Sequence, residues 1–131
     1  MGQPLFIVTP QIWRVQIVAA NTNLDGTGTL LSLASGNAAP GSRIDKIRIQ
    51  GVGTVADGMI RFFLANSAGS TKHLIKEREV KATAPTGTVR GFEDEWTLQE
   101  GLTLPDQTWS VLVGTHAGNT FNIFGFGGNL G

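Results

Sequence analysis

The sequence contains no cysteine and few charged residues. Without cysteine, the chain has no disulfide bond, no thiolate metal ligand and no cysteine nucleophile. Charged residues make up 15% of the chain, below the usual share of about 25%, and ten basic residues balance ten acidic ones. A neutral chain creates no net field that attracts nucleic acid or an anionic membrane, so we expect neither partner. A weakly charged surface favours self-association, and we expect a homodimer or homotrimer.

Groupings of residues that carry enzyme chemistry are also missing. The two histidines, His73 and His116, have no His or Cys neighbour at the spacing of a zinc site. The sequence has no G-x-S-x-G motif, and its Gly-rich turns precede no helix that would bind phosphate. Glu93 and Glu95 alternate with Asp94, which is more typical of a solvated strand face than of a glycosidase carboxylate pair. We therefore predict a protein that is not an enzyme and has no cofactor or metal.

The amino terminus has no long hydrophobic run. The apolar residues Leu5–Val8 lie between Pro4 and Pro10 and are too few for a signal peptide or a membrane span. The two prolines disfavour a helix and a central strand, so residues 1–11 are predicted to form an extended arm. This arm either covers the edge of its own domain or reaches a neighbouring subunit. Residues 12–131 have the length of a single domain.

Apolar residues at every second position mark the stretch Ser42–Asn66, around which the rest of the chain is organised. Two such runs flank a Gly-rich connector, and Lys46, Arg48 and Arg61 lie between the apolar positions. The pattern predicts two half-buried strands that form an antiparallel pair. Phe63 falls on the same face as Arg61, where an exposed aromatic residue would mark an interface. The predicted core residues of the pair are Ile47, Ile49, Ile60, Phe62 and Leu64.

Six further segments have the composition of β-strands. The run Lys72–Val80 has few apolar residues, but its neighbours favour a strand over a helix. Eight short strands separated by turns, with no convincing helix, indicate an all-β antiparallel β-sandwich or a small barrel. The jelly roll and the up-and-down barrel both have eight strands, and we favour a single jelly-roll-like sandwich. The six further strands are expected over residues 13–19, 30–33, 72–80, 88–98, 109–113 and 120–127.

One loop resembles a calcium site in the spacing of its oxygen-bearing side chains. Asn21, Asn23 and Asp25 occupy alternate positions, and Gly26 follows. However, no Glu closes the pattern and strands rather than helices flank it. The dipeptide Asp25-Gly26 is instead predicted to form a hairpin turn.

The tryptophans raise a second alternative, because indole rings can stack on sugars. The chain has three tryptophans, Trp13, Trp96 and Trp109. Two of them lie on the apolar faces of alternating strands, which favours a place in the core. The same alternation turns Asp94 inward together with Phe92 and Trp96, and it leaves the two neighbouring glutamates in solvent. A carboxylate is the one residue that does not suit such a face.

Three segments of the sequence together resemble a recurrent family of small β proteins encoded in tailed-phage and prophage genomes. They are NLDGTGTL, SRIDKIRIQGVGTVADGMIRFFL and VKATAPTGTVRGFEDEWTLQEGLTLPDQTWSVLVGTHAGNTFNIFGFGG. The resemblance covers roughly residues 19–128 in pattern and order. Small β-sandwich proteins on phage heads act as cement or decoration proteins, which stabilise the capsid by bridging its major capsid subunits. The family implies no catalytic residues.

The resemblance implies a virion structural protein on the capsid exterior, present in the host cytoplasm before assembly. Its expected partners are the major capsid protein and further copies of itself, and the apolar ends of the chain are the expected contact surfaces. The alternative is a carbohydrate- or receptor-binding β-sandwich module of a head fibre or tail, with exposed Trp as its platform. The predicted interface residues are Leu5, Phe6, Ile7, Val8, Phe63, Phe124 and Phe126.

Overall fold

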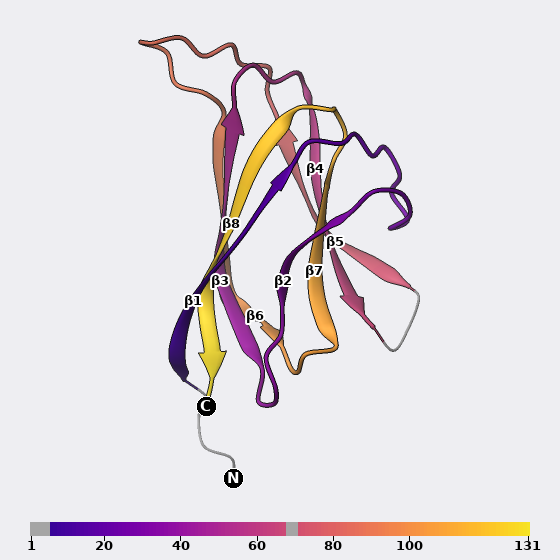
Figure 1. Ribbon diagram of the computed structural model, residues 1–131, viewed down its shortest axis with the longest axis vertical. Coiled ribbons are helices and arrows are strands. Elements are labelled where there is room, and N and C mark those ends of the chain that lie inside the picture. Colours follow the sequence, from indigo (N-terminus) through magenta and orange to yellow (C-terminus); the bar gives the residue numbers. More distant parts are fainter. Residues whose placement is uncertain (1–5, 68–70) are drawn as a thin grey trace.

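The computed structural model of the chain describes residues 6–67 and 71–131 and consists of β-strands arranged in two layers (Figure 1). The predicted strands are all present, although β6 begins at Glu93 rather than Thr88 and continues to Leu104. The described strands are β1 (Ile7–Ile17), β2 (Leu31–Ser35), β3 (Ser42–Val52), β4 (Gly58–Asn66), β5 (Lys72–Val80), β6 (Glu93–Leu104), β7 (Trp109–Thr115) and β8 (Thr120–Leu130).

Each layer is a four-stranded antiparallel sheet. The first sheet has the order β1-β8-β3-β6, and the second has the order β2-β7-β4-β5. The first strand therefore pairs with the eighth, the second with the seventh, the third with the sixth and the fourth with the fifth. This nested pairing is that of a jelly roll. The predicted all-β, jelly-roll-like sandwich is confirmed, and two separate sheets exclude the closed barrel.

The strands β3 and β4 do not pair with each other, so that prediction is wrong. β3 lies between β8 and β6 in the first sheet, whereas β4 lies between β7 and β5 in the second. The connector crosses from one sheet to the other, and both strands still turn an apolar face to the shared core. Alternation identifies the buried face of a strand but not its neighbour. The predicted core is confirmed, with Ile47, Ile49, Ile60 and Phe62 fully buried and Leu64 partly buried against them.

The amino-terminal boundary at residue 11 also differs from the prediction. Residues 7–11 are the first half of β1, where they pair with the end of β8. Pro10 is accommodated because β1 is the outermost strand of its sheet, and an edge strand needs hydrogen bonds on one side only. Leu5 lies outside the described residues. Within the described chain, the expected arm is therefore an edge strand of the sandwich.

Phe63 is buried, with 1% of its surface exposed, so its prediction as an exposed interface residue is wrong. It lies opposite the core cluster, on the outer face of the second sheet. Residues 18–30, which connect β1 to β2, cross this outer face: a Cβ added to Gly114 of β7 would lie 2.8 Å from the Leu30 side chain. A crossing loop therefore covers the face that the sequence pattern would expose.

Asn21 holds this crossing loop together. Its buried side-chain Nδ2 donates to the carbonyl oxygens of Thr27 and Thr29 at 3.0 and 2.8 Å, and its Oδ1 accepts from the backbone N–H of Asn23 at 3.0 Å. The carboxylate of Asp25 accepts from both the backbone N–H and the hydroxyl of Thr27. Because β1 and β2 belong to different sheets, the predicted hairpin at Asp25 is wrong. These side chains instead shape a turn inside the crossing loop.

Candidate interaction surface

The outer face of the first sheet carries an aromatic strip on its inner strand β8. Phe121 and Ile123 point into the core, so Phe124 and Phe126 point outward. Their rings lie 6.4 Å apart between centroids and are inclined by 25°, in a stacked arrangement. Both are half-buried. Two of the predicted interface residues thus lie side by side on the surface.

Neighbouring strands surround this strip with one apolar and three basic side chains. The cross-strand register places Arg14 of β1 and Arg48 of β3 on either side of Phe124. It likewise places Ile12 and Lys46 on either side of Phe126, and the ammonium group of Lys46 lies 5.7 Å from the centre of that ring. Ile12 is 61% exposed. We call this surface, from β1 across β8 and β3 to β6, the outer face.

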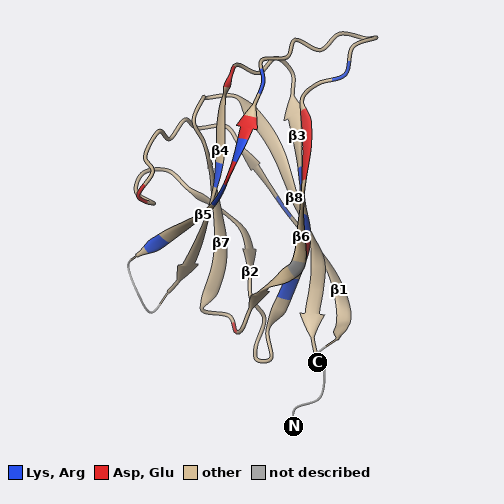
Figure 2. Ribbon diagram, turned by 180° about the vertical axis from the view of Figure 1, so that it is seen from behind, with Lys and Arg blue, Asp and Glu red and all other residues tan. Residues whose placement is uncertain are grey.

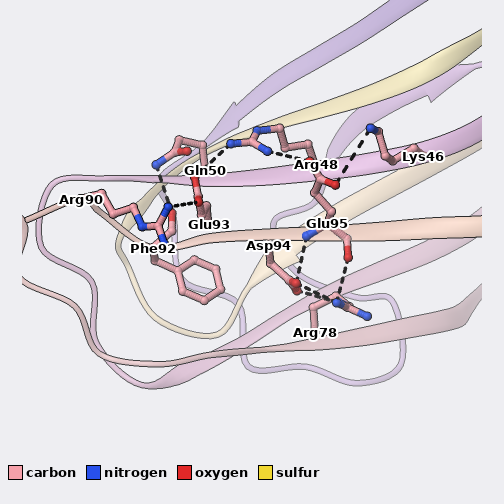
Figure 3. A network of polar contacts seen from close by, with 9 residues as sticks. All are labelled: Lys46, Arg48, Gln50, Arg78, Arg90, Phe92, Glu93, Asp94 and Glu95. Carbon is pink, nitrogen blue, oxygen red and sulfur yellow. Dashed lines mark hydrogen bonds and ion pairs between the residues drawn. The ribbon is translucent and has the colours of Figure 1, made fainter.

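The far edge of the outer face is acidic. Glu93 and Glu95 of β6 are exposed, as the alternation predicts. In Figure 2 the start of β6 is red with acidic residues. Arg48 donates to Glu95 at 2.7 Å and to Glu93 at 3.0 Å, while Lys46 and Arg90 approach these carboxylates at 4.0 and 3.3 Å (Figure 3). Exposed ion pairs contribute little to stability, typically about 0–1 kcal/mol. Their main effect here is to orient the side chains on this surface.

Asp94, between these two glutamates, points the other way and joins the two sheets. Its carboxylate accepts two hydrogen bonds from the guanidinium of Arg78 on β5, both at 2.7 Å, and Arg78 also donates to the carbonyl oxygen of Glu95 (Figure 3). Hydrogen bonds from Arg78 hold the pKa of Asp94 below its usual value, and they raise the pKa of Arg78. The predicted inward carboxylate thus has a partner on the opposite sheet.

A second cross-sheet contact lies beside this pair. The ammonium group of Lys76 on β5 sits 5.7 Å from the centre of the Trp96 ring, which in turn packs 5.5 Å from Phe62. Trp13, Trp96 and Trp109 all pack, partly buried, against the core. None of the three indoles is exposed. The contacts of Lys76 with Trp96 and of Arg78 with Asp94 close the sandwich along its β5–β6 edge.

The start of β1 forms a second apolar surface. Phe6 and Val8 are 66% and 61% exposed, whereas Ile7 between them is half-buried. The backbone N–H of Gly131 donates to the carbonyl oxygen of Phe6 at 3.1 Å, so this patch adjoins the carboxyl terminus. Of the predicted interface residues that the structure describes, Phe6 and Val8 are the exposed ones. Val8 lies on the same strand as Ile12, which the sequence prediction missed, and Phe6 immediately precedes that strand.

The missed residues Ile12 and Arg14 had a detectable signal. Trp13, Val15 and Ile17 alternate inward, so their neighbours must point outward. Placing a boundary after residue 11 separated Ile12 from the apolar residues that precede it. An edge strand that continues through Pro10 connects them.

One cleft on the second sheet combines charges of both signs. It has a volume of about 360 Å³, and its lining includes Asp57, Arg61, Lys81 and His116. Within the described chain, the buried Nη1 of Arg61 has no hydrogen-bond partner, while its Nε lies 3.3 Å from Glu77. Lys81 is paired with a neighbouring glutamate at 2.6 Å. Because positive and negative groups offset each other, the cleft favours neither an anion nor a cation.

The described residues include neither a cluster of metal ligands nor a helix that could span a membrane. Among residues 6–67 and 71–131, no three His, Cys, Asp or Glu side chains come together as metal ligands. His73 and His116 are both exposed. Over the same ranges, no helix has the length and apolar character of a membrane span. No protein-family model matches this chain, and no curated protein sequence matches it either.

Proposed function

We propose that this chain is a non-enzymatic structural protein of a tailed-phage virion, a cement or decoration protein that binds the major capsid protein from outside the shell. The resemblance to small phage-encoded β proteins supports this proposal, and so does the jelly-roll sandwich, an architecture used by viral capsid domains. The protein would act as an oligomer and stabilise the shell by bridging capsid subunits.

The exposed apolar residues at the start of β1 carry the proposal. Phe6 and Val8 lie close together in the chain with about two thirds of their surface in water, next to the carboxyl terminus. Burying such side chains against a partner contributes roughly 1.5–3 kcal/mol each before the entropic cost of association. An oligomer that presents this patch several times would bind a repeating capsid lattice far more tightly than one copy.

Co-sedimentation with capsids tests the proposal. Shells assembled from the major capsid protein of the same phage or prophage are mixed with the purified chain and pelleted. The unmodified chain should pellet with the shells, and a Phe6→Ser/Val8→Ser variant should not. A Val52→Ser/Val89→Ser variant is the matched control, because those valines are exposed apolar residues too, at about half of their surface, but lie elsewhere. Failure of the unmodified chain to pellet, or equal binding by both variants, would contradict the proposal.

The sugar-binding alternative loses the feature on which it depended. It required an exposed tryptophan as a stacking platform, and all three tryptophans pack against the core. Phe124 and Phe126 are the aromatic rings that remain at the surface of the first sheet, and basic and apolar neighbours surround them. We therefore propose no carbohydrate ligand.

A further inference from the structure

We infer that a second copy of this chain packs on the outer face, related to the first by a two-fold axis parallel to the strands, with Arg14 of each copy against Glu95 of the other. This inference deepens the proposed function, because it names the surface through which the subunits of the oligomer meet. It can be tested on the purified chain alone, so its failure is distinguishable from a failure of capsid binding.

The outer face is free and large enough for a dimer. A crossing loop covers the outer face of the second sheet, but Ile12, Arg14 and Gln16 on the first sheet are all exposed. Four strands of about 11 residues present a face of roughly 700 Å² at the usual strand spacing and rise. A standard protein interface buries about 800 Å² on each partner. The whole of this face would therefore be needed, and two sheets can pack in this aligned way.

The centre of the outer face has the composition of an interface. Phe124 and Phe126 form its aromatic strip, and Ile12 adds an exposed aliphatic side chain beside them. Aromatic residues and arginine are enriched at the buried centres of protein interfaces, whereas the rims are polar. The strip lies near the middle of the sheet, with charged residues toward both edges.

Basic side chains lie on β1 and β3 of the outer face, and its acidic side chains lie on the edge strand β6, where Arg48 of β3 pairs with them. Arg14 is the only charged residue of β1, and it makes no hydrogen bond or ion pair with the described part of the chain. At the opposite edge, β6 presents Glu93 and Glu95. Arg14, Phe124, Arg48 and Glu95 are successive cross-strand partners, so they form one row across the sheet. Over the described residues, the row begins with an unpaired cation and ends with an anion.

This row is complementary to itself in one orientation. A two-fold axis parallel to the strands reverses the strand order, so β1 of one copy faces β6 of the other and β8 faces β3. Arg14 then faces Glu95 of the second copy, and the ring of Phe124 faces the guanidinium of Arg48. A two-fold axis perpendicular to the strands would instead place β1 on β1 and β6 on β6, with like charges together. Electrostatics therefore selects the parallel axis.

Sedimentation velocity on the full chain tests the charge pairing. The unmodified chain should form a dimer, and Arg14→Glu and Glu95→Lys should each weaken it by at least about tenfold in Kd. The double variant should recover much of the lost affinity, because the pair is restored with opposite signs. Lys81→Glu is the control for Arg14→Glu. It also replaces a cation by an anion, at an exposed site away from this face, and should leave the dimer intact. Circular dichroism confirms that each variant is folded.

Crosslinking tests the axis directly, because the chain has no native cysteine. An Arg14→Cys/Glu95→Cys variant should form covalent dimers with a short thiol-to-thiol crosslinker. The single Arg14→Cys variant should not, since the inferred axis keeps its two thiols, one from each copy, on opposite sides of the interface.

Four results would overturn the inference. They are a monomeric unmodified chain, absence of rescue in the charge-swapped double variant, no covalent dimer from the Arg14→Cys/Glu95→Cys variant, and crosslinking of the single Arg14→Cys variant. A monomer whose capsid binding is lost in Arg14→Glu would assign this face to the capsid protein, and it would equally overturn the dimer.

Discussion

Asp94 is a carboxylate on the inward face of β6, where its neighbours are Phe92 and Trp96. Strand alternation alone predicts this position, but it does not predict what stabilises the charge there. The partner, Arg78, comes from the edge strand of the opposite sheet and lies 16 residues earlier in the chain. Pairing between two sheets depends on how the sheets are stacked, and that information is absent from the pattern of either strand.

Replacing Asp94 by Asn should lower the free energy of unfolding by about 1–2 kcal/mol, because Arg78, which is only a quarter exposed, would lose the carboxylate charge and one of its two acceptor oxygens. Urea denaturation followed by tryptophan fluorescence measures the change. Glu79→Gln is the matched control: Glu79 pairs with Lys81 at an exposed site, and its loss should change stability by less than about 0.5 kcal/mol. Equal effects of the two substitutions would show that the cross-sheet pair contributes no more to stability than an exposed ion pair does.

The same pair predicts how stability depends on pH. The pKa of Asp94 is lower in the folded chain than its value of about 3.9 in an unfolded one, because Arg78 donates hydrogen bonds to the carboxylate. Its contribution is therefore fully present above about pH 4 and is lost as the pH falls through the lowered folded-state pKa. The stability difference between the unmodified chain and Asp94→Asn should be constant near neutral pH and shrink in acid. A difference that grows on acidification would contradict this assignment.

At the scale of elements, the crossing loop of residues 18–30 explains the clearest error of sequence interpretation. Strand alternation places Phe63 on an outward face, and it does so correctly, since Phe63 lies opposite the core. What it does not predict is that a loop from elsewhere in the chain covers this face. A loop's own sequence specifies its turns, as Asn21 and Asp25 do, but not the surface on which it rests.

Asn21→Ala should loosen this loop, because the carbonyl oxygens of Thr27 and Thr29 would lose their donor inside the structure. We expect a loss of about 1–3 kcal/mol in unfolding free energy. We also expect faster cleavage by a protease within residues 22–29. Thr22→Ala is the control, since Thr22 is exposed and should have little effect on either measurement. Unchanged proteolysis in Asn21→Ala would mean that other contacts hold the loop in place.

At the scale of the whole molecule, strand positions were predictable and strand partners were not. Most of the strands and the buried faces of β3, β4 and β6 follow from apolar residues at every second position, whereas β5, which has few apolar residues, was predicted from its neighbours. In the jelly roll, however, each strand pairs with one that is distant in sequence, except for β4 with β5. The outer face shows the same contrast between what the sequence of one strand predicts and what depends on strand pairing. Phe124 and Phe126 were predicted as interface residues from β8 alone, whereas the row from Arg14 to Glu95 exists only through pairing with β1, β3 and β6.

The nested pairing brings the two ends of the described chain together, and this leads to a prediction about chain connectivity. Because the N–H of Gly131 bonds to the carbonyl oxygen of Phe6, residues 1–5 can join Gly131 to Phe6 in a circular permutant. New ends between Gly87 and Thr88 would lie in the β5–β6 connection, which projects beyond the sandwich, and a Cβ at Gly87 would meet no atom within 4 Å (Figure 1). This permutant should fold, since every strand pair is retained.

A second permutant opened between Leu112 and Val113 would cut β7, which lies between β2 and β4, and should not fold. Circular dichroism and two-dimensional NMR spectra distinguish the two results. If the first permutant also failed to fold, the order in which the strands are connected, and not their pairing alone, would be required for the jelly roll to form.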